Sequence, residues 1–417
     1  MERDFSKTKY GSFLVIPLKF QDEPNVQNFE KLFDVHNIST PDLNPNVKAL
    51  FHNESIPNVG KCYRLRKEKL YRYMDVTDYT LSVHNDGYSY RWAFRDSYLY
   101  LFHTKVAFFC LGIEYEEILA LQAICNPGFA VNTAKFFCDQ EQRQFSLNEM
   151  LGEFLKQLQL QQFFDTESIL LDYYSYNLAL FPERFDTMEE MKKLSFNLHQ
   201  MIPLDFDMDD HSERDVHYVF AVRDYAHNSY RWGCCVTSQT ISYVVADKQM
   251  DFDSEWTAQA EDGLPVVILS LYQKYTCLRF NQLLTDTPTK NAKTLKALKR
   301  LMLNFKAFGT VAPANLSRWD NVRQIYHYLM DVNGVNQALA DIVDKLNILT
   351  SHQEAIEQKK NDTILNIITI FGIVSILASV LSIVQILSGA DTLLWTVTVL
   401  TSLILMGAII IVFRFKD

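Results

Sequence analysis

Two uncharged segments near the C-terminal end constrain this sequence more than any other feature. Residues 363–387 and 392–413 contain no Asp, Glu, Lys or Arg, and they are 25 and 22 residues long. An α-helix needs about 20 apolar residues to cross about 30 Å of hydrocarbon. A core helix of a soluble protein would carry a polar stripe, and neither segment has one. We therefore predict a hairpin of two transmembrane helices joined by the external turn 388–391; the alternative is a buried helical hairpin.

Basic residues lie at both outer ends of the hairpin, and its turn has none. Lys359 and Lys360 precede the first segment, two basic residues lie in the tail 414–417, and the turn carries one charge, Asp391. Because basic flanks stay in the cytoplasm, we expect residues 1–362 and the tail to be cytoplasmic. The N-terminus has no signal-peptide pattern. Seven scattered cysteines without a CxxC pair are typical of a reducing compartment.

A heptad pattern leads into the first segment. Between residues 316 and 362, apolar residues recur at alternating steps of three and four, with Gln353 as the polar member of the seam. No proline follows Ala314 before the end of the first segment, so we predict one continuous helix of about 70 residues. The seam is buried against the protein's own domain, against the basic helix expected at 289–308, or against copies of the chain. The basic helix is either solvated or attracts phosphate and phospholipid headgroups.

The first 284 residues mix strand and helix patterns. Strands are expected at 9–20, 79–94, 98–115 and 217–245, and helices at 146–164, 187–201 and 264–284. This mixture predicts an α/β domain over 1–284 in which mixed sheets are flanked by helices. The basic helix and the stalk helix then occupy 285–362.

The tetrapeptide Ser-Tyr-Arg-Trp occurs twice, at 89–92 and 229–232. A guanidinium group suits phosphate and an aromatic face suits an adenine ring. The ligand-binding candidates are therefore Arg91, Trp92, Arg231 and Trp232. Chance similarity between strands and an ancient hairpin duplication are the alternatives. Successive strand residues point to opposite faces, so one hairpin cannot direct both members of a pair at one ligand.

The acidic segment 205–215 offers Asp207, Asp209 and Asp210 as metal ligands. It lacks the central Gly and terminal Glu of a calcium loop, and a solvated acidic loop is the alternative. The sequence contains no P-loop, GxGxxG, GxSxG or HExxH motif, so we expect no enzyme activity and no catalytic residues. A net charge of −10 argues against general nucleic-acid binding.

A cytoplasmic α/β domain, a stalk helix and a C-terminal hairpin with both ends inside resemble the CorA family of divalent-cation channels and transporters. The likeness covers the layout of the whole chain and is closest from about residue 316 onward. It implies a homopentamer in the inner or plasma membrane, with Mg²⁺ as a cation and the first transmembrane helix lining the pore. The polar pore-lining candidates are Asn366, Thr369, Ser375, Ser379, Ser382, Gln385 and Asp391. An apolar stripe that starts at Ile367 is the alternative lining, and it would close the axis by dewetting.

The sequence departs from the family at the end of the first segment. Family members end it with Tyr-Gly-Met-Asn, whereas this chain has Val384-Gln385-Ile386-Leu387. Divergent members without the signature include membrane effectors of prokaryotic antiviral defence, among them type III CRISPR systems. These respond to a nucleotide second messenger such as adenylated S-adenosylmethionine (SAM-AMP). The resemblance thus favours a ligand-gated effector channel; a housekeeping magnesium transporter and a non-conducting membrane-anchored sensor or scaffold are the alternatives.

Overall fold

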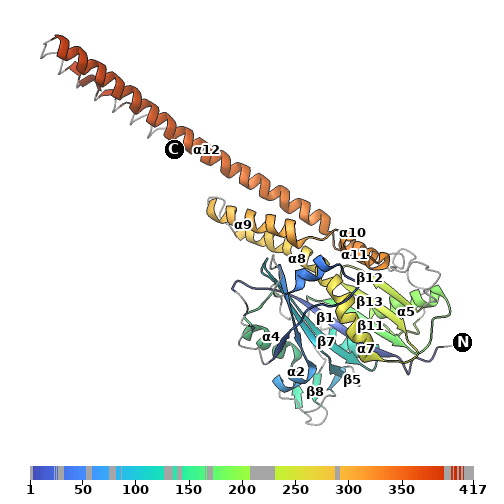
Figure 1. Cartoon of the computed structure of the whole chain (residues 1–417). Coiled ribbons are helices and arrows are strands. Elements are labelled where there is room, and N and C mark those ends of the chain that lie inside the picture. The colour runs from blue at the N-terminus through green and yellow to red at the C-terminus, as the bar shows by residue number, and fades with distance from the viewer. Residues whose placement is uncertain are drawn as a thin grey trace. The chain divides into compact units, whose positions relative to one another are not determined.

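The structure is a computed structural model of the chain (Figure 1). It describes residues 3–22, 24, 26, 32–52, 59–74, 81–85, 87–125, 135–138, 143–164, 166, 172–206, 231–286, 292–388, 396, 397, 399–401, 403, 404 and 407. The chain divides into two compact units. The first unit comprises Met1–Asp286 and Leu298–Ile342, and the second comprises Thr287–Ala297 and Val343–Asp417.

A mixed β-sheet forms the core of the first unit. Its main path runs β12-β13-β11-β1-β7-β5-β4-β8-β9; β10 also pairs with β1, and β2, β3 and β6 extend from β7. The strands are β1 (Lys9–Lys19), β2 (Phe33–Val35), β3 (Gly60–Leu65), β4 (Leu81–Asn85), β5 (Tyr88–Phe94), β6 (Ser97–Phe102), β7 (Val106–Tyr115), β8 (Lys135–Cys138), β9 (Arg143–Phe145), β10 (Gln161–Gln162), β11 (Tyr174–Phe181), β12 (Trp232–Val236) and β13 (Thr240–Ala246). Among these pairs β11 and β13 are parallel, and the others are antiparallel.

Strand β1 lies at the centre of this sheet. It pairs antiparallel with both β7 and β11, and its side chains are buried on both faces. Strands that are covered on both faces are apolar throughout rather than alternating. This explains the continuous apolar run from Phe13 to Leu18.

Helices cover both faces of the sheet. They are α1 (Pro45–Lys48), α2 (Lys67–Tyr73), α3 (Ile118–Cys125), α4 (Leu147–Gln157), α5 (Met188–Gln200), α7 (Phe252–Ala258), α8 (Leu264–Asp286), α10 (Pro313–Leu316) and α11 (Asp320–Val332), with a short 3₁₀ turn at Ala49–Phe51. Helices α3, α4 and α5 share one core with Leu14 of β1. On the opposite face, the ring of Trp256 from α7 packs on Phe13 at 4.1 Å and Tyr275 from α8 packs on Phe108 of β7.

Capping side chains set the starts of three of these helices. Ser146 accepts a hydrogen bond from the backbone N–H of Glu149, and Thr187 accepts one from that of Glu190. Asp251 does the same for the backbone N–H of Ser254 at the start of α7. A side-chain oxygen at this position satisfies an N–H that the first helical turn leaves unpaired. The predicted helix starts near 146 and 187 are therefore confirmed.

A glycine in β7 allows the close contact with α7. A Cβ at Gly112 would lie 2.3 Å from the carbonyl oxygen of Asp96 and 3.0 Å from the ring of Trp256. Backbone cannot give way as a flexible side chain can, so this position requires glycine. The close approach brings α7, and with it Asp253, beside the end of the sheet.

Most predicted elements of the first unit are confirmed, with two corrections. The helix expected at 146–164 ends at Gln157 and is followed by β10. The strands expected at 217–245 reduce to β12 and β13 in the described residues, and 217–230 lie outside them. The prediction of a mixed α/β domain before a long apolar helix is confirmed.

The predicted continuous helix over the stalk is wrong in one respect. Helix α11 ends at Val332, Asn333 caps it, and Gly334 has a left-handed φ of +59°. Helix α12 (Val335–Ser388) then continues for 54 residues. Glycine is the residue that adopts a left-handed conformation without strain, and such residues end helices.

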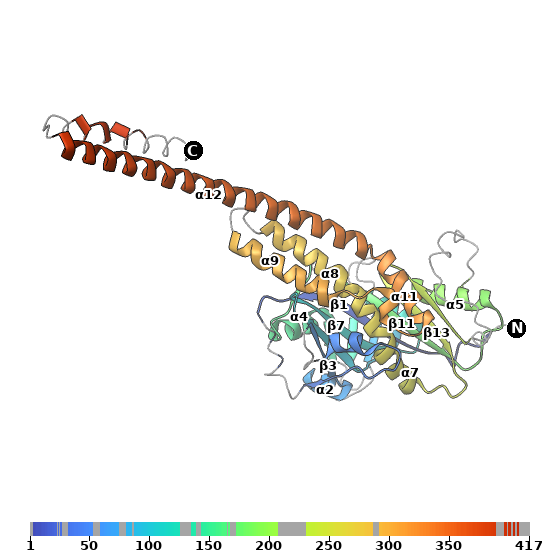
Figure 2. The same ribbon diagram turned by 45° about the horizontal axis from the view of Figure 1, so that its top comes forward.

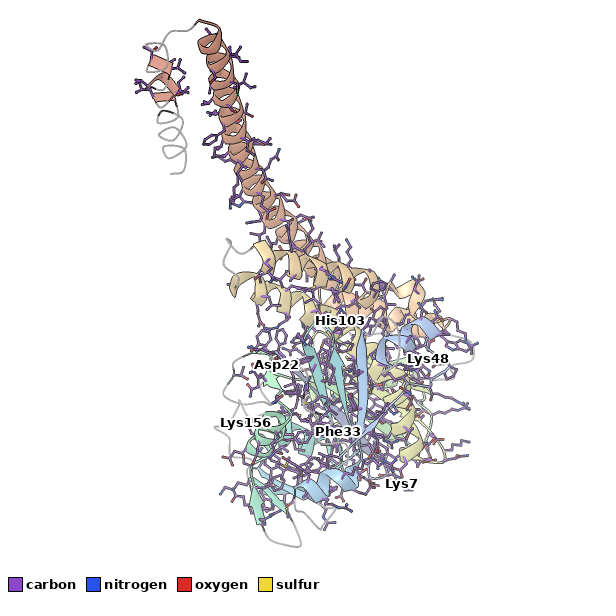
Figure 3. The ribbon with its side chains drawn as sticks, turned by 60° about the vertical axis from the view of Figure 1, so that its left-hand side comes forward. Lys7, Asp22, Phe33, Lys48, His103 and Lys156 are labelled. Atoms are coloured by element: carbon purple, nitrogen blue, oxygen red, sulfur yellow. The ribbon has the colours of Figure 1, made fainter. Side chains whose placement is uncertain are left out.

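Helix α12 passes out of the first unit and forms most of the second. Its stretch Val335–Val384 is the one helix in the described part of the chain that is long and apolar enough to cross a membrane. Its side chains project outward along its length (Figure 3). Figure 2 shows helix α9 (Ala292–Asn304) running antiparallel to α12; a π-helical turn, Phe305–Gly309, follows α9. The described residues between 396 and 407 are helical.

Candidate functional site

The uncharged part of α12 exposes large apolar side chains. Ile364, Leu365, Ile368, Phe371, Ile373, Ile376, Val380 and Ile383 are all exposed. In water these residues would leave an apolar surface that soluble proteins bury or pair. A lipid environment removes that cost.

The polar pore candidates that the structure describes lie on the exposed surface of α12. Asn366, Thr369, Ser375, Ser379 and Ser382 are exposed. The side chain of Gln385 and residue Asp391 lie outside the described residues.

Hydroxyl groups in this stretch bond to the backbone of their own helix. The hydroxyl of Ser379 donates to the carbonyl of Ser375 at 2.8 Å, and that of Ser382 donates to Ala378 at 2.9 Å. Thr369 donates to Leu365 at 2.8 Å. Such bonds satisfy a hydroxyl in lipid without a water-filled path.

The alternative apolar stripe is partly covered. Ile367 and Ile370 are half-buried and Val374 is buried, whereas Leu377 is exposed. The stripe is thus covered over part of its length. In a single chain, the face that carries Ser375, Ser379 and Ser382 is therefore more exposed than the apolar stripe.

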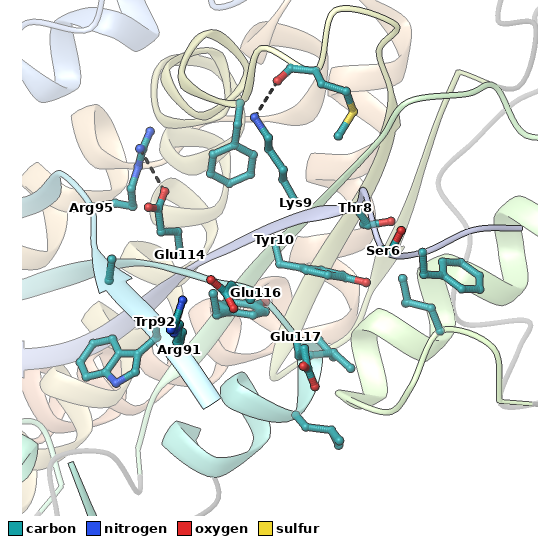
Figure 4. A pocket seen from close by; sticks show the side chains of 18 of the residues that line it. Ser6, Thr8, Lys9, Tyr10, Arg91, Trp92, Arg95, Glu114, Glu116 and Glu117 are labelled. Atoms are coloured by element: carbon teal, nitrogen blue, oxygen red, sulfur yellow. Dashed lines mark hydrogen bonds and ion pairs between the residues drawn. The ribbon is translucent and has the colours of Figure 1, made fainter. Parts of the chain in front are cut away.

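A large cavity of about 1120 Å³ lies at the start of strand β1 and the ends of strands β5 and β7 of the first unit (Figure 4). Its walls also include residues before β1, the start of α3, the start of α7 and the segment after α5. The charged side chains of its lining are Lys9, Arg91, Arg95, Glu114, Glu116, Glu117, Asp205, Asp251 and Asp253. A concave site of this size with several convergent polar groups is the usual form of a small-molecule site.

Two of the three cations in this lining are held by the protein itself. Arg95 pairs with Glu114 at 3.1 Å and with Asp253, and its guanidinium lies over the rings of Phe252 and Trp256. The hydrogen bond and charge of Arg95 lower the pKa of the Asp253 carboxyl. Lys9 donates to the carbonyl oxygen of Met250 at 3.0 Å (Figure 4). These contacts make Arg95 and Lys9 structural members of the wall.

The remaining charges make the cavity acidic. Arg91 is exposed on β5, while Glu116, Glu117 and Asp205 supply carboxylates from other segments. The ring of Tyr10 stacks on that of Tyr115, with centroids 5.7 Å apart. Burial, and then the charges of Glu117 and Asp205, raise the pKa of Tyr10 to about 12. Aromatic faces beside carboxylates attract cationic groups.

The structure does not bring the four ligand-binding candidates together. Arg91 and Trp92 both line the large cavity, but the indole of Trp92 is 2 % exposed and packs among Phe94, Phe136 and Phe145. The two neighbours point apart because successive strand residues face opposite sides. The second copy of the motif lies elsewhere: Trp232 lines a different cavity, and Arg231 is exposed.

This second, small cavity of about 270 Å³ lies beside α11. Trp232 of the edge strand β12 and Tyr243 of β13 form one wall, Ile325 of α11 forms another, and Asp42, Glu255 and Asp262 supply carboxylates. Burial raises the pKa of the Glu255 and Asp262 carboxyls, and the charge of Asp262 raises that of Glu255 further. A π-helical turn, Gln259–Gly263, joins α7 to α8 here, a feature that is frequent at functional sites.

No metal site emerges from the described residues. Asp207, Asp209 and Asp210 lie outside them, and the described part of the chain has no group of three or more His, Cys, Asp or Glu that could hold a metal ion. Asp251 is engaged as the cap of α7.

Sequence patterns identified Arg91 but missed most of the residues around it. Tyr10, Glu117 and Asp205 come from three distant segments, and of these only Asp205 belongs to a pattern noted in the sequence, as the first residue of the acidic segment 205–215. In the structure, Glu117 follows the end of β7 closely, Tyr10 lies near the start of β1, and Asp205 follows α5.

Comparisons of the chain with protein-family models, with curated proteins and with solved structures found no match.

Proposed function

We propose that this chain is a ligand-gated membrane channel of CorA type that acts as a homo-oligomer, with a pentamer as the expected form. The observation that carries the proposal is the continuity of α12, which starts in the α/β unit and extends through an exposed, uncharged stretch. A continuous helix transmits a displacement of its first turns along its length. A change at the α/β unit is thereby linked to the membrane segment.

The membrane assignment draws on length and exposure. The uncharged stretch of α12 exceeds the 20 or so residues that hydrocarbon requires, and its apolar side chains are exposed. We propose that residues 363–387 and 392–413 span the bilayer as a hairpin, with the α/β unit and the C-terminus in the cytoplasm. One chain cannot enclose a pathway with two helices, so conduction requires several copies around an axis.

The large cavity is the proposed ligand site. In its described lining, Lys9 and Arg95 are engaged by protein groups, which leaves Arg91 to bind an anionic group of the ligand. Glu116, Glu117 and Asp205 disfavour a polyphosphate, because each added negative charge meets three carboxylates. A nucleotide second messenger such as SAM-AMP has one phosphate and compensating positive charges. Its phosphate suits Arg91, and its positive charges suit the three carboxylates. We propose such a ligand, and with it a role in prokaryotic antiviral defence of the type III CRISPR kind.

A non-conducting anchor is the second candidate. The hydroxyl groups of Thr369, Ser379 and Ser382 are satisfied by their own helix, so none of them requires contact with water. In that case the hairpin holds a ligand-binding unit at the membrane and no ion passes. A constitutive magnesium transporter differs from both in needing no nucleotide.

Reconstituted vesicles distinguish these functions. The full chain is purified in detergent, inserted into vesicles loaded with Mg²⁺ or K⁺ reporter dyes, and tested with and without SAM-AMP. We expect flux only with the nucleotide. Flux of Mg²⁺ without nucleotide would indicate a transporter, and no flux under any cation gradient would indicate an anchor.

A matched pair of variants tests the cavity. Arg91→Ala removes the arginine of the large cavity, whereas Arg231→Ala makes the same change at an exposed position of the second motif copy. We expect Arg91→Ala to weaken nucleotide binding about tenfold or more, since a charge-assisted hydrogen bond is lost. Isothermal titration measures this effect, and equal affinities for both variants would exclude the cavity as the nucleotide site.

A further inference from the structure

The second unit carries a basic surface where α12 approaches its uncharged stretch. We define this basic surface by four exposed lysines, Lys293 and Lys296 of α9 and Lys359 and Lys360 of α12. The stretch 287–309 that contains α9 has six basic residues and no acidic residue. Clustered charge of one sign on an exposed surface attracts anions.

One ion pair places α9 along α12. The ammonium nitrogen of Lys296 lies 3.7 Å from a carboxylate oxygen of Glu357. Glu357 precedes the uncharged stretch, which begins at Thr363, by six residues, or about 9 Å of helix. Lys293 precedes Lys296 by three residues, so the two lysines share one face of α9.

This distance brings the lysines within reach of lipid headgroups. The polar region of a bilayer adds about 5–8 Å to each side of the hydrocarbon. Electrostatic attraction extends a further ~8 Å at physiological ionic strength. Long lysine side chains extend their charge toward the headgroups while their stems lie along apolar surface. All four ammonium groups therefore meet the headgroup layer once the stretch from Thr363 is in the membrane.

The acids nearby do not cancel this charge. Glu357 and Asp362 lie in the same stretch, so four lysines less two carboxylates leave a net charge of +2. The Lys296–Glu357 pair is exposed on both sides, with side-chain exposures of 70 % and 45 %. Exposed pairs contribute little to stability, so a phosphate can replace Glu357 as the partner of Lys296.

We propose that this basic surface binds the anionic headgroups of the cytoplasmic leaflet, phosphodiester lipids such as phosphatidylglycerol. The inference rests on the proposed insertion of α12 and goes beyond it, because an anchored or conducting hairpin requires no particular lipid. Binding holds the start of α9 at the membrane surface. The stability of α9 then depends on the lipid composition.

Hydrogen exchange in nanodiscs tests the proposal. The full chain is placed in discs of pure phosphatidylcholine and in discs that contain one quarter phosphatidylglycerol. We expect slower amide exchange over residues 293–304 in the anionic discs, and phosphatidylglycerol retained on the released protein in native mass spectrometry. Inorganic phosphate added to the neutral discs should not reproduce the protection; if it does, a free-phosphate site replaces the lipid site.

Two double variants with equal charge change serve as the comparison. Lys293→Gln/Lys296→Gln changes the basic surface, whereas Lys7→Gln/Lys248→Gln removes two exposed lysines of the first unit. We expect the first pair to reduce the preference for phosphatidylglycerol roughly tenfold or more, and the second to leave it unchanged.

The outcomes separate this inference from the proposed function. If the wild-type chain enters discs but α9 exchanges equally in both lipids, the lipid site is wrong and the channel proposal stands. If both double variants lose the preference equally, the surface is not specific. If the chain does not enter discs at all, the membrane proposal itself fails.

Discussion

Burial keeps His199 uncharged near neutral pH. This residue lies half-buried in the last turn of α5, and its ring lies near that of Phe196. Burial lowers its pKa from 6.5 to about 4, because the charged imidazolium loses its hydration there. The unfolded chain therefore takes up a proton between these pH values and the folded chain does not.

The sign of the resulting pH dependence follows from proton uptake. Stability rises with pH wherever the unfolded state binds more protons, so the fold loses stability at His199 as the pH drops from 6.5 toward 4. At pH 5 we expect the loss to be about 2 kcal/mol. Thermal unfolding of the detergent-solubilised chain at pH 7.5 and pH 5, compared with His199→Asn, measures it. A variant as acid-sensitive as the wild type would contradict the assignment.

Residues that depend on distant partners could not be predicted from the sequence. Arg95 follows the first Ser-Tyr-Arg-Trp motif closely, but its partner Asp253 lies 158 residues away. A local pattern carries no information about such a pair. Arg91 was predicted because its motif recurs, whereas the carboxylates opposite it belong to no repeat.

At the scale of elements, the join between α11 and α12 decides how the first unit connects to the long apolar helix. Lys274 of α8 donates to the side chain of Asn333 at 2.9 Å, and Tyr326 of α11 bonds to Gln273 of α8. These contacts fix α11 and its cap on α8. The left-handed conformation of Gly334 then ends the helical path of α11, and α12 begins as a separate helix at Val335.

Alanine substitutions at two glycines test this join. Gly334→Ala places a Cβ on a residue with a φ of +59°, and we expect a loss of about 1 kcal/mol in the free energy of unfolding. Gly372→Ala makes the same change inside α12, where a Cβ would meet nothing within 4 Å, so stability should stay equal or rise slightly. Denaturant titration in detergent compares the two, and an unaffected Gly334→Ala chain would mean that the join tolerates a continuous helix.

The elements themselves were largely predictable, and the reason is periodicity. Strand β1 and helices α5 and α8 have long stretches rich in apolar residues, which predict their positions. The end of α11 was missed because a single glycine inside a heptad pattern costs a helix only about 1 kcal/mol. The pair Asn333-Gly334 was the available signal, since both residue types favour helix ends.

At the scale of the whole molecule, an α/β unit with two acidic cavities and a long helix with an uncharged end occur in one chain. The fold class could be predicted from the mixture of strand and helix patterns in the first 284 residues and from the length of the apolar stretch. The cavities could not, because they form where strands from distant parts of the sequence end. The function therefore depends on whether the uncharged end of α12 lies in lipid.

Two isoleucines of α12 test that placement directly. Ile348 and Ile376 are equally exposed, at 68 % and 66 %, but only Ile376 lies within the uncharged stretch. Arginine at the centre of a membrane helix costs about 3 kcal/mol on insertion, whereas arginine on an exposed stalk costs almost nothing. We expect Ile376→Arg to lower the fraction of chain that resists alkaline extraction from membranes and Ile348→Arg to leave it unchanged. If both variants stay in the membrane fraction to the same extent, residue 376 is not in the hydrocarbon, and α12 ends in water.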